Sequence, residues 1–234
     1  MREVWREHID KFMKTSELAK KIQYTNVRAE ATRSEIRQHC ETALEYGFQG
    51  VMIQPCWVTL AQEILKSSSL VVASAIAYPM GGDTTEMKVR AAREIVRLGV
   101  DEFDFLPNIG YLRSGMLGEF EGEIRQVVKA AGGRPVKSMS EFGFLTREQR
   151  IDCITLAERA GVAYVKNSSG IGPGGSPAAP KDIRFIKEHL SGTAKIKASG
   201  GIKSYSQAVS LLQAGGRSAW SKCRPCHNGG PVYG

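Results

Sequence analysis

Three lysines and one aspartate recur along the sequence at intervals that could bring their side chains together. Asp104, Lys137, Lys166 and Lys197 each lie within a short apolar run. Successive members are about 30 residues apart, which is the length of one strand with its following helix. An ionisable residue inside a strand of a parallel sheet is unusual, because both faces of such a sheet are covered. Equivalent positions on four successive strands would place all four groups in one interior.

Such a cluster would change the chemistry of its amines. Neighbouring ammonium groups and burial both lower the pKa of a lysine. A neutral lysine is a nucleophile that can form a Schiff base with a carbonyl compound. The resulting imine withdraws electrons from the adjacent C–C bond, so that bond can be broken or formed without a metal. For any one lysine alone, the alternative is a solvated residue at a strand edge. The shared spacing with Asp104 favours an active site.

Two glycine-rich turns follow the last two lysine-bearing runs. They are the stretch from Gly170 to Ser176 and the sequence Ser199-Gly-Gly201. Glycine allows backbone N–H groups to approach and hold a phosphate, although ordinary turns also use glycine. Their place directly after the runs that carry Lys166 and Lys197 favours a phosphate-binding role.

The segments that must position these residues alternate between apolar runs and amphipathic helices. The expected strands are 22–27, 50–54, 70–77, 101–106, 135–140, 162–167 and 194–199. Expected helices include 32–45, 85–98, 120–131, 147–160, 180–189 and 204–212, and an amphipathic helix within residues 4–20 precedes them. The alternation predicts an α/β fold with a parallel sheet. Seven strands without a dinucleotide-binding motif favour a (β/α)8 TIM barrel with an extra N-terminal helix, whose active site would lie at the carboxyl ends of the strands.

The C-terminal stretch departs from this alternation. A barrel needs one more apolar strand and a closing helix after Gly215, but residues 216–234 show neither a strand-like nor a helix-like period. We therefore expect the eighth strand and the last helix to be missing or replaced by an aberrant tail. The predicted organisation is a barrel domain over residues 1–215, with its N-terminal helix in residues 1–20, and an atypical tail over 216–234. An open barrel would leave its first and seventh strands as exposed edges.

Composition narrows the class of protein. The chain has 234 residues, 42% of them hydrophobic, with 32 Lys and Arg against 24 Asp and Glu, for a net charge of +8. That charge suits an anionic small molecule, and its scattered distribution argues against nucleic acid. No apolar run reaches the roughly 18 residues of a membrane span. The N-terminus has no apolar signal segment, and the five cysteines are an odd number, so we expect reduced thiols and a cytoplasmic protein.

Several motifs together resemble the deoxyribose-phosphate aldolase family, over about residues 21–215. The most specific are Lys166-Asn-Ser-Ser-Gly170 and Lys197-Ala-Ser-Gly-Gly201. Supporting motifs are Asp101-Glu-Phe-Asp104, Asn108-Ile-Gly110 with Ser114-Gly115, and Gly133-Arg-Pro-Val-Lys137. The family comprises class I aldolases, which are lyases of nucleoside catabolism on a (β/α)8 barrel. The resemblance implies reversible cleavage of 2-deoxy-D-ribose 5-phosphate to acetaldehyde and D-glyceraldehyde 3-phosphate.

The resemblance also implies roles for individual residues. Lys166 would form the imine, Lys197 would lower its pKa and relay protons together with Asp104, and Lys137 would orient that network. Gly172, Gly200 and Gly201 would hold the phosphate through backbone amides, and Ser168 would also contact the substrate. No metal and no organic cofactor are expected. The partner would be a small phosphorylated sugar; a homodimer is compatible with the sequence, which does not fix the oligomeric state.

Three departures from the family pattern bear on this prediction. Gln23 stands where members usually carry the carboxylate of an Asp-His-Thr segment, and Met52 stands where the second strand usually has a cysteine, with Cys56 displaced. Neither position supplies the imine, so these changes concern efficiency. The third departure is the tail, which lacks the family's Arg-(Leu/Ile)-Gly-(Thr/Ala)-Ser-(Ser/Ala)-Gly strand. Read one base later with suitable synonymous codons, residues 216–230 can encode such a strand, so a frameshift would explain the tail, and the nucleotide sequence would test this.

Two other functions stay open on the sequence. One is a catalytically impaired barrel that lacks the eighth-strand phosphate loop and is either a binder of a phosphometabolite or a frameshifted product. The other is a related imine-forming aldolase with a different acceptor, which Gln23 suggests.

Overall fold

The computed structural model describes residues 13–170 and 177–221, which form a closed barrel of eight parallel strands in sequential order. The strands are β1 (Ile22–Asn26), β2 (Gly50–Ile53), β3 (Val71–Ile76), β4 (Glu102–Phe105), β5 (Val136–Met139), β6 (Tyr164–Lys166), β7 (Lys195–Ile202) and β8 (Ser218–Ser221). Each of the seven expected strands coincides with an observed one. The prediction of a (β/α)8 barrel is confirmed.

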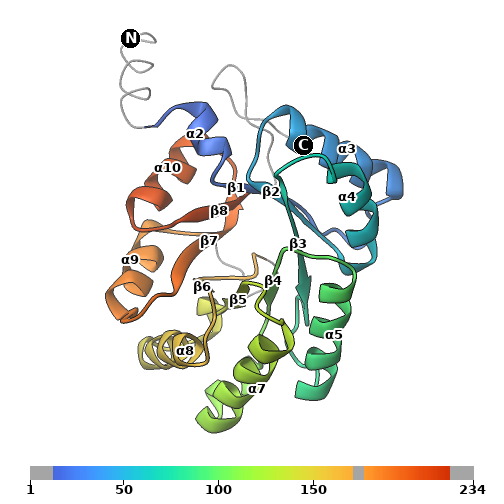
Figure 1. Ribbon diagram of the computed structural model, residues 1–234. Coiled ribbons are helices and arrows are strands. Elements are labelled where there is room, and N and C mark those ends of the chain that lie inside the picture. The colour runs from blue at the N-terminus through green and yellow to red at the C-terminus, as the bar shows by residue number, and fades with distance from the viewer. Residues whose placement is uncertain (1–12, 171–176, 222–234) are drawn as a thin grey trace, which may run out of the picture.

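Helices surround the barrel and cover the outer face of its strands (Figure 1). The α-helices are α2 (Thr15–Ala19), α3 (Arg33–Glu45), α4 (Val58–Leu65), α5 (Thr85–Arg97), α6 (Ile109–Arg113), α7 (Leu117–Ala130), α8 (Arg147–Arg159), α9 (Pro180–His189) and α10 (Tyr205–Gln213), and the 3-10 turns are η1 (Pro55–Trp57) and η2 (Phe142–Phe144). Of the predicted N-terminal helix, only α2 falls within the described residues. Tyr205 of α10 donates a hydrogen bond to the Met13 carbonyl, which ties the start of the described chain to the barrel wall.

The prediction that the eighth strand is missing is wrong. Residues 218–221 pair in parallel with β1 on one side and β7 on the other, so neither neighbour is left as an exposed edge. This strand is short, and the small residues Ser218 and Ala219 give it no apolar alternation, but Ala219 is fully buried. Backbone pairing to two neighbours requires no such pattern. The expected loss of the closing helix concerns residues that lie outside the described ranges, as does most of the predicted tail.

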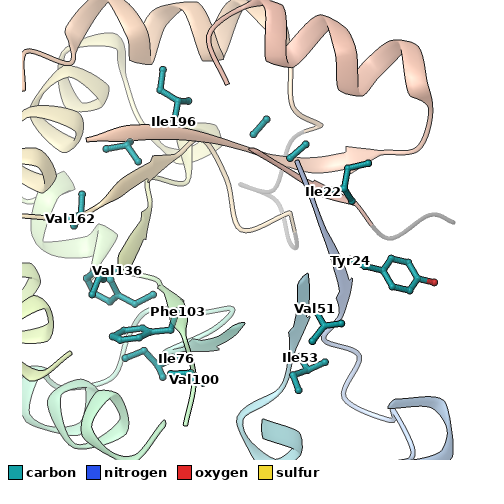
Figure 2. Packing of buried hydrophobic residues seen from close by; sticks show 14 of the residues in the cluster. Ile22, Tyr24, Val51, Ile53, Ile76, Val100, Phe103, Val136, Val162 and Ile196 are labelled. Atoms are coloured by element: carbon teal, nitrogen blue, oxygen red, sulfur yellow. The ribbon is translucent and has the colours of Figure 1, made fainter. Parts of the chain in front are cut away.

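The apolar core lies between the strands and the helices. Side chains alternate between the two faces of a strand, so the outward residues of each strand pack under the helices. Tyr24 of β1 and Phe103 of β4 lie on this outer side (Figure 2), and both are buried. Their sequence neighbours Gln23, Glu102 and Asp104 consequently point into the barrel. The same alternation that builds the outer core therefore delivers polar side chains to the interior.

A buried ion pair outside the barrel links two helices to two loops that follow strands. Lys88 of α5 and Glu123 of α7 are each 1% exposed, with Nζ and Oε1 2.9 Å apart. Lys88 also donates to the Gly81 carbonyl at 2.7 Å, and Glu123 Oε1 accepts from the Asn108 backbone N–H at 2.7 Å. Burial lowers the pKa of Lys88, against the opposing effect of Glu123. The pair thus fixes the loops after β3 and β4 at the carboxyl-end face.

We expect Glu123→Gln to lower the free energy of unfolding by about 3–5 kcal/mol, because it leaves the Lys88 charge buried without its partner. The double variant Lys88→Met/Glu123→Gln should lose less, since glutamine can still accept from the Asn108 N–H and no ammonium is buried. Urea unfolding of the wild type, both single variants and the double variant at pH 7 measures the coupling. Additive losses would contradict this account of the pair.

Candidate active site

Six polar side chains from five strands meet inside the barrel. They are Gln23 of β1, Glu102 and Asp104 of β4, Lys137 of β5, Lys166 of β6 and Lys197 of β7. Strand register explains the meeting, because Asp104 is the Cα partner of Lys137, and Lys166 is that of Lys197. Lys166 is the last residue of its strand, which places it at the carboxyl end where barrel enzymes act.

Asp104 is the centre of this cluster. Its Oδ2 accepts a hydrogen bond from Lys166 Nζ within an ion pair. Its Oδ1 lies 3.3 Å from Lys137 Nζ and 3.7 Å from Lys197 Nζ. A single carboxylate therefore faces three amines.

Burial and mutual charge set the ionisation of these groups. The three lysines and Asp104 are each no more than 1% exposed. Burial, assisted by Lys137, lowers the pKa of Lys166, and burial together with Lys137 and Lys166 lowers that of Lys197 further. Burial alone would raise the pKa of Asp104, but Lys166, Lys197 and Lys137 together hold it well below its usual range. The site therefore holds an ionised carboxylate beside two amines, those of Lys166 and Lys197, that lose their protons more easily than usual.

Backbone and side-chain hydrogen bonds fix the chain that follows Lys166. Asn167 Nδ2 donates to the Ser199 carbonyl and Asn167 Oδ1 accepts from the Ser199 N–H, each at 2.9 Å. Glu141 accepts from the Ser169 N–H at 2.6 Å and from its hydroxyl. Glu141 is itself held in the left-handed region at φ 44°. These contacts bind the ends of β5, β6 and β7 into one unit.

The predicted binding residues lie in the loops at this end of the barrel. Ser168 is buried, and its Oγ accepts from the Gly170 N–H at 2.9 Å. Gly200 and Gly201, within β7, have φ values of 113° and 59°, which is backbone that favours glycine. Gly200 also accepts from the Ala178 N–H at 2.9 Å. Gly172 lies outside the described residues. The structure brings Lys166, Lys197, Asp104 and Lys137 together. Ser168 follows Lys166 closely in the sequence, and Gly200 and Gly201 follow Lys197 in the same way.

Two members of the cluster were not assigned to it from the sequence. Glu102 Oε1 lies 2.6 Å from Lys137 Nζ, and its position two residues before Asp104, on the same face of the strand, was the available signal. Gln23 was recognised only as a departure from the family pattern. In the structure it accepts a hydrogen bond from Lys197 Nζ and donates one to Glu102 Oε1 at 2.7 Å.

The parts of the chain that the structure describes contain no group of three His, Cys, Asp or Glu side chains arranged to hold a metal. In the same residues, no helix is long and apolar enough to cross a membrane. Met52 is fully buried in β2, and Cys56 is exposed in the turn after it.

A closed parallel barrel with amines and carboxylates gathered inside it defines an enzyme of the (β/α)8-barrel class. The chain is 39% identical over 203 residues to the deoxyribose-phosphate aldolase of Dictyoglomus turgidum, covering 87% of this chain and 92% of that one. It is 40% identical over 205 residues to the one from Methanocella arvoryzae, covering 87% and 90%. The chain belongs to the deoxyribose-phosphate aldolase family, and it is a lyase.

Solved structures agree with the fold. The deoxyribose-phosphate aldolase of Aeropyrum pernix, described as a tetramer, superimposes with a TM-score of 0.82 at 24% identity, covering 94% of this chain and 93% of that one. An aldolase designated QR15 superimposes with a TM-score of 0.83 at 26% identity, covering 88% and 91%. No family model matches the chain.

Proposed function

We propose that this enzyme cleaves 2-deoxy-D-ribose 5-phosphate reversibly to acetaldehyde and D-glyceraldehyde 3-phosphate through a Schiff base on Lys166. The observation that carries the proposal is the contact of Lys166 Nζ with Asp104 Oδ2, while Asp104 Oδ1 faces Lys137 and Lys197. This arrangement lets Lys166 transfer its proton through the carboxylate to a second amine and become a nucleophile.

The steps follow from that arrangement. Lys166 Nζ attacks the C1 aldehyde of the open-chain sugar, and loss of water gives an iminium ion. Removal of the proton from the C3 hydroxyl breaks the C2–C3 bond, the electron pair moves to the iminium as an enamine, and glyceraldehyde 3-phosphate leaves. Protonation of the enamine carbon and hydrolysis then release acetaldehyde. Asp104 and Lys197 would relay these protons, and Lys137, between Asp104 and Glu102, would hold the carboxylate in place.

The substrate phosphate would bind at the backbone of Gly200 and Gly201, together with Gly172. Glycine at these positions supports the assignment, since the φ values of Gly200 and Gly201 favour glycine and leave their amides unshielded by a side chain. Ser168 would complete this side of the site. The alternative of an impaired barrel stays a second proposal: β8 closes the sheet, but the loop that would follow β8 lies outside the described residues. Cytoplasmic location and a homodimer stay predictions.

Borohydride trapping tests the Schiff base directly. After incubation with acetaldehyde and borohydride, intact mass and peptide mapping should find one ethyl group on Lys166. In a second assay the enzyme should release glyceraldehyde 3-phosphate from 2-deoxyribose 5-phosphate, with a much higher kcat/KM than for free deoxyribose. A folded sample that forms no adduct, or forms it on a different lysine, would refute the mechanism. Adduct formation without cleavage of the phosphorylated sugar would refute the substrate.

A further inference from the structure

Gln23 closes a ring of polar side chains inside the barrel. Starting at Asp104 Oδ1, the ring passes through Lys137 at 3.3 Å to Glu102 at 2.6 Å, then to Gln23 at 2.7 Å. It continues through the hydrogen bond between Gln23 and Lys197, and returns from Lys197 to Asp104 at 3.7 Å. Gln23 is the one member of this ring without an ionisable group, and it is completely buried.

The chemistry of its neighbours orients the Gln23 amide. Glu102 is ionised beside Lys137, since that lysine lowers its pKa against the effect of burial, and an ionised carboxylate can only accept hydrogen bonds. The amide NH2 group must therefore face Glu102, which turns the amide oxygen toward Lys197. That oxygen accepts an N–H from Lys197 whether the lysine is an amine or an ammonium ion. Gln23 thus directs Lys197 without requiring it to be charged.

Charge balance distinguishes Lys197 from the other two lysines. The cluster contains three lysines and two carboxylates, and Glu141 adds a third carboxylate that acts on Lys166. A buried ammonium ion without a close carboxylate is costly. Lys166 has Asp104 Oδ2, and Lys137 lies close to both carboxylates. Lys197 has the longer 3.7 Å approach to Asp104 and a neutral amide, so it is the lysine that loses its proton most easily.

Other titratable groups near the lysines do not give Lys197 a closer carboxylate. Glu141 acts on Lys166, and it accepts hydrogen bonds from the N–H and hydroxyl of Ser169. Tyr164 lies next to Lys137, with its ring centroid 5.7 Å from Nζ. Burial raises the pKa values of Tyr164 and Tyr78, which keeps both phenols neutral.

We propose that Gln23 is a positioning residue that aims Lys197 at Asp104 without adding the negative charge that would hold the lysine's proton, so that Lys197 can accept the proton that Lys166 releases when it attacks the substrate. The proton moves from Lys166 Nζ through Asp104 to Lys197 Nζ, so no charge is gained or lost by the cluster. A carboxylate at position 23 would instead face Lys197 directly, raise the pKa of that lysine and shift this proton transfer to higher pH. The inference rests on the proposed function, because it concerns activation of the same lysine.

The test compares pH profiles of kcat/KM for the wild type, Gln23→Glu and Gln23→Met with 2-deoxyribose 5-phosphate. Gln23→Glu has nearly the same shape and adds one negative charge. On the acidic limb of the profile, kcat/KM falls as Lys197 gains a proton. Gln23→Glu should shift this limb to higher pH by about one unit or more.

Gln23→Met removes both hydrogen bonds without adding charge. It should leave that limb in place and lower kcat about tenfold, with little change in KM. Gln38→Glu, on the exposed face of α3, is the matched charge control and should behave as wild type.

A Gln23→Glu profile that coincides with that of the wild type would overturn the inference, and so would a Gln23→Met variant with full activity. The methionine variant decides the question if the glutamate variant fails to fold. A wild type that cleaves no 2-deoxyribose 5-phosphate at any pH would instead overturn the proposed function. In that case the pH dependence of acetaldehyde trapping on Lys166 still shows, for each variant, the pH at which protonation stops the reaction.

Discussion

Lys166→Arg is expected to abolish both borohydride trapping and turnover, with kcat/KM falling by at least about 10⁴-fold, the scale on which loss of a covalent nucleophile acts. Arginine keeps a positive charge beside Asp104 and preserves the ion pair. It cannot be deprotonated in the accessible pH range, so it cannot attack an aldehyde. The variant thus separates the electrostatic role of the side chain from its role as a nucleophile.

Two measurements make this expectation specific. Intact mass after acetaldehyde and borohydride should show no ethyl group, and urea unfolding should show a folded protein. Lys181→Arg, at an exposed position of α9, is the matched control and should retain both trapping and turnover. Residual activity within a hundredfold of wild type would mean that another lysine forms the imine or that no imine forms.

Asp104→Asn should produce the largest loss of stability among changes in the interior. The three lysines that face this carboxylate would lose their shared partner, and we expect the free energy of unfolding to fall by about 3–5 kcal/mol at pH 7. In wild type the pKa of Asp104 is lowered in the folded state, so its contribution is present above its unfolded pKa and is lost as pH falls through the folded value. Activity should fall at least about a hundredfold, since the proton path between the amines is removed.

The loss of unfolding free energy caused by Asp104→Asn should become smaller as pH rises from 7 toward about 10, which is the ordinary pKa of a lysine in the unfolded chain. Over this interval the unfolded chain binds more protons than the folded one, so the stability of the variant increases with pH. Urea unfolding at pH 7 and 9.5 measures the difference. Asp101→Asn is the control, because that side chain only accepts from the Val72 N–H at 2.8 Å and asparagine can replace it. Equal losses at both pH values would contradict the electrostatic explanation.

The sequence predicted most of the barrel because its strands and helices carry strong patterns. Seven apolar runs at regular spacing specify seven strands, and their spacing alone placed Asp104, Lys137, Lys166 and Lys197 in equivalent register. Asp104 pairs with Lys137 and Lys166 with Lys197, as that register requires, but Lys166 pairs with Met139 rather than with Lys137. Lys166 and Lys197 therefore lie two residues nearer the carboxyl ends than Asp104 and Lys137, on the same face. Period-two alternation is a local property, so it can be read without knowing the tertiary structure.

Features that depend on distant partners were not predictable in the same way. β8 is a strand because β1 and β7 offer backbone donors and acceptors on both sides, whereas its own residues give no apolar signal. Gln23 and Glu102 meet across 79 residues, and nothing in either local sequence indicates the contact. Glu102 could have been added from its spacing to Asp104. The role of Gln23 required the geometry of its two hydrogen bonds.

The ring also couples chemical reactivity to completion of the fold. The Gln23–Lys197 contact spans 174 residues, so it cannot exist until the first and seventh strands are both in the barrel. Before that point the lysines are solvated and have ordinary pKa values of about 10.4, so at neutral pH they are mostly protonated and react slowly with aldehydes. In a nascent or partly unfolded chain these three lysines are therefore no more reactive than the others, and the enhanced nucleophile exists only where the barrel is closed around it.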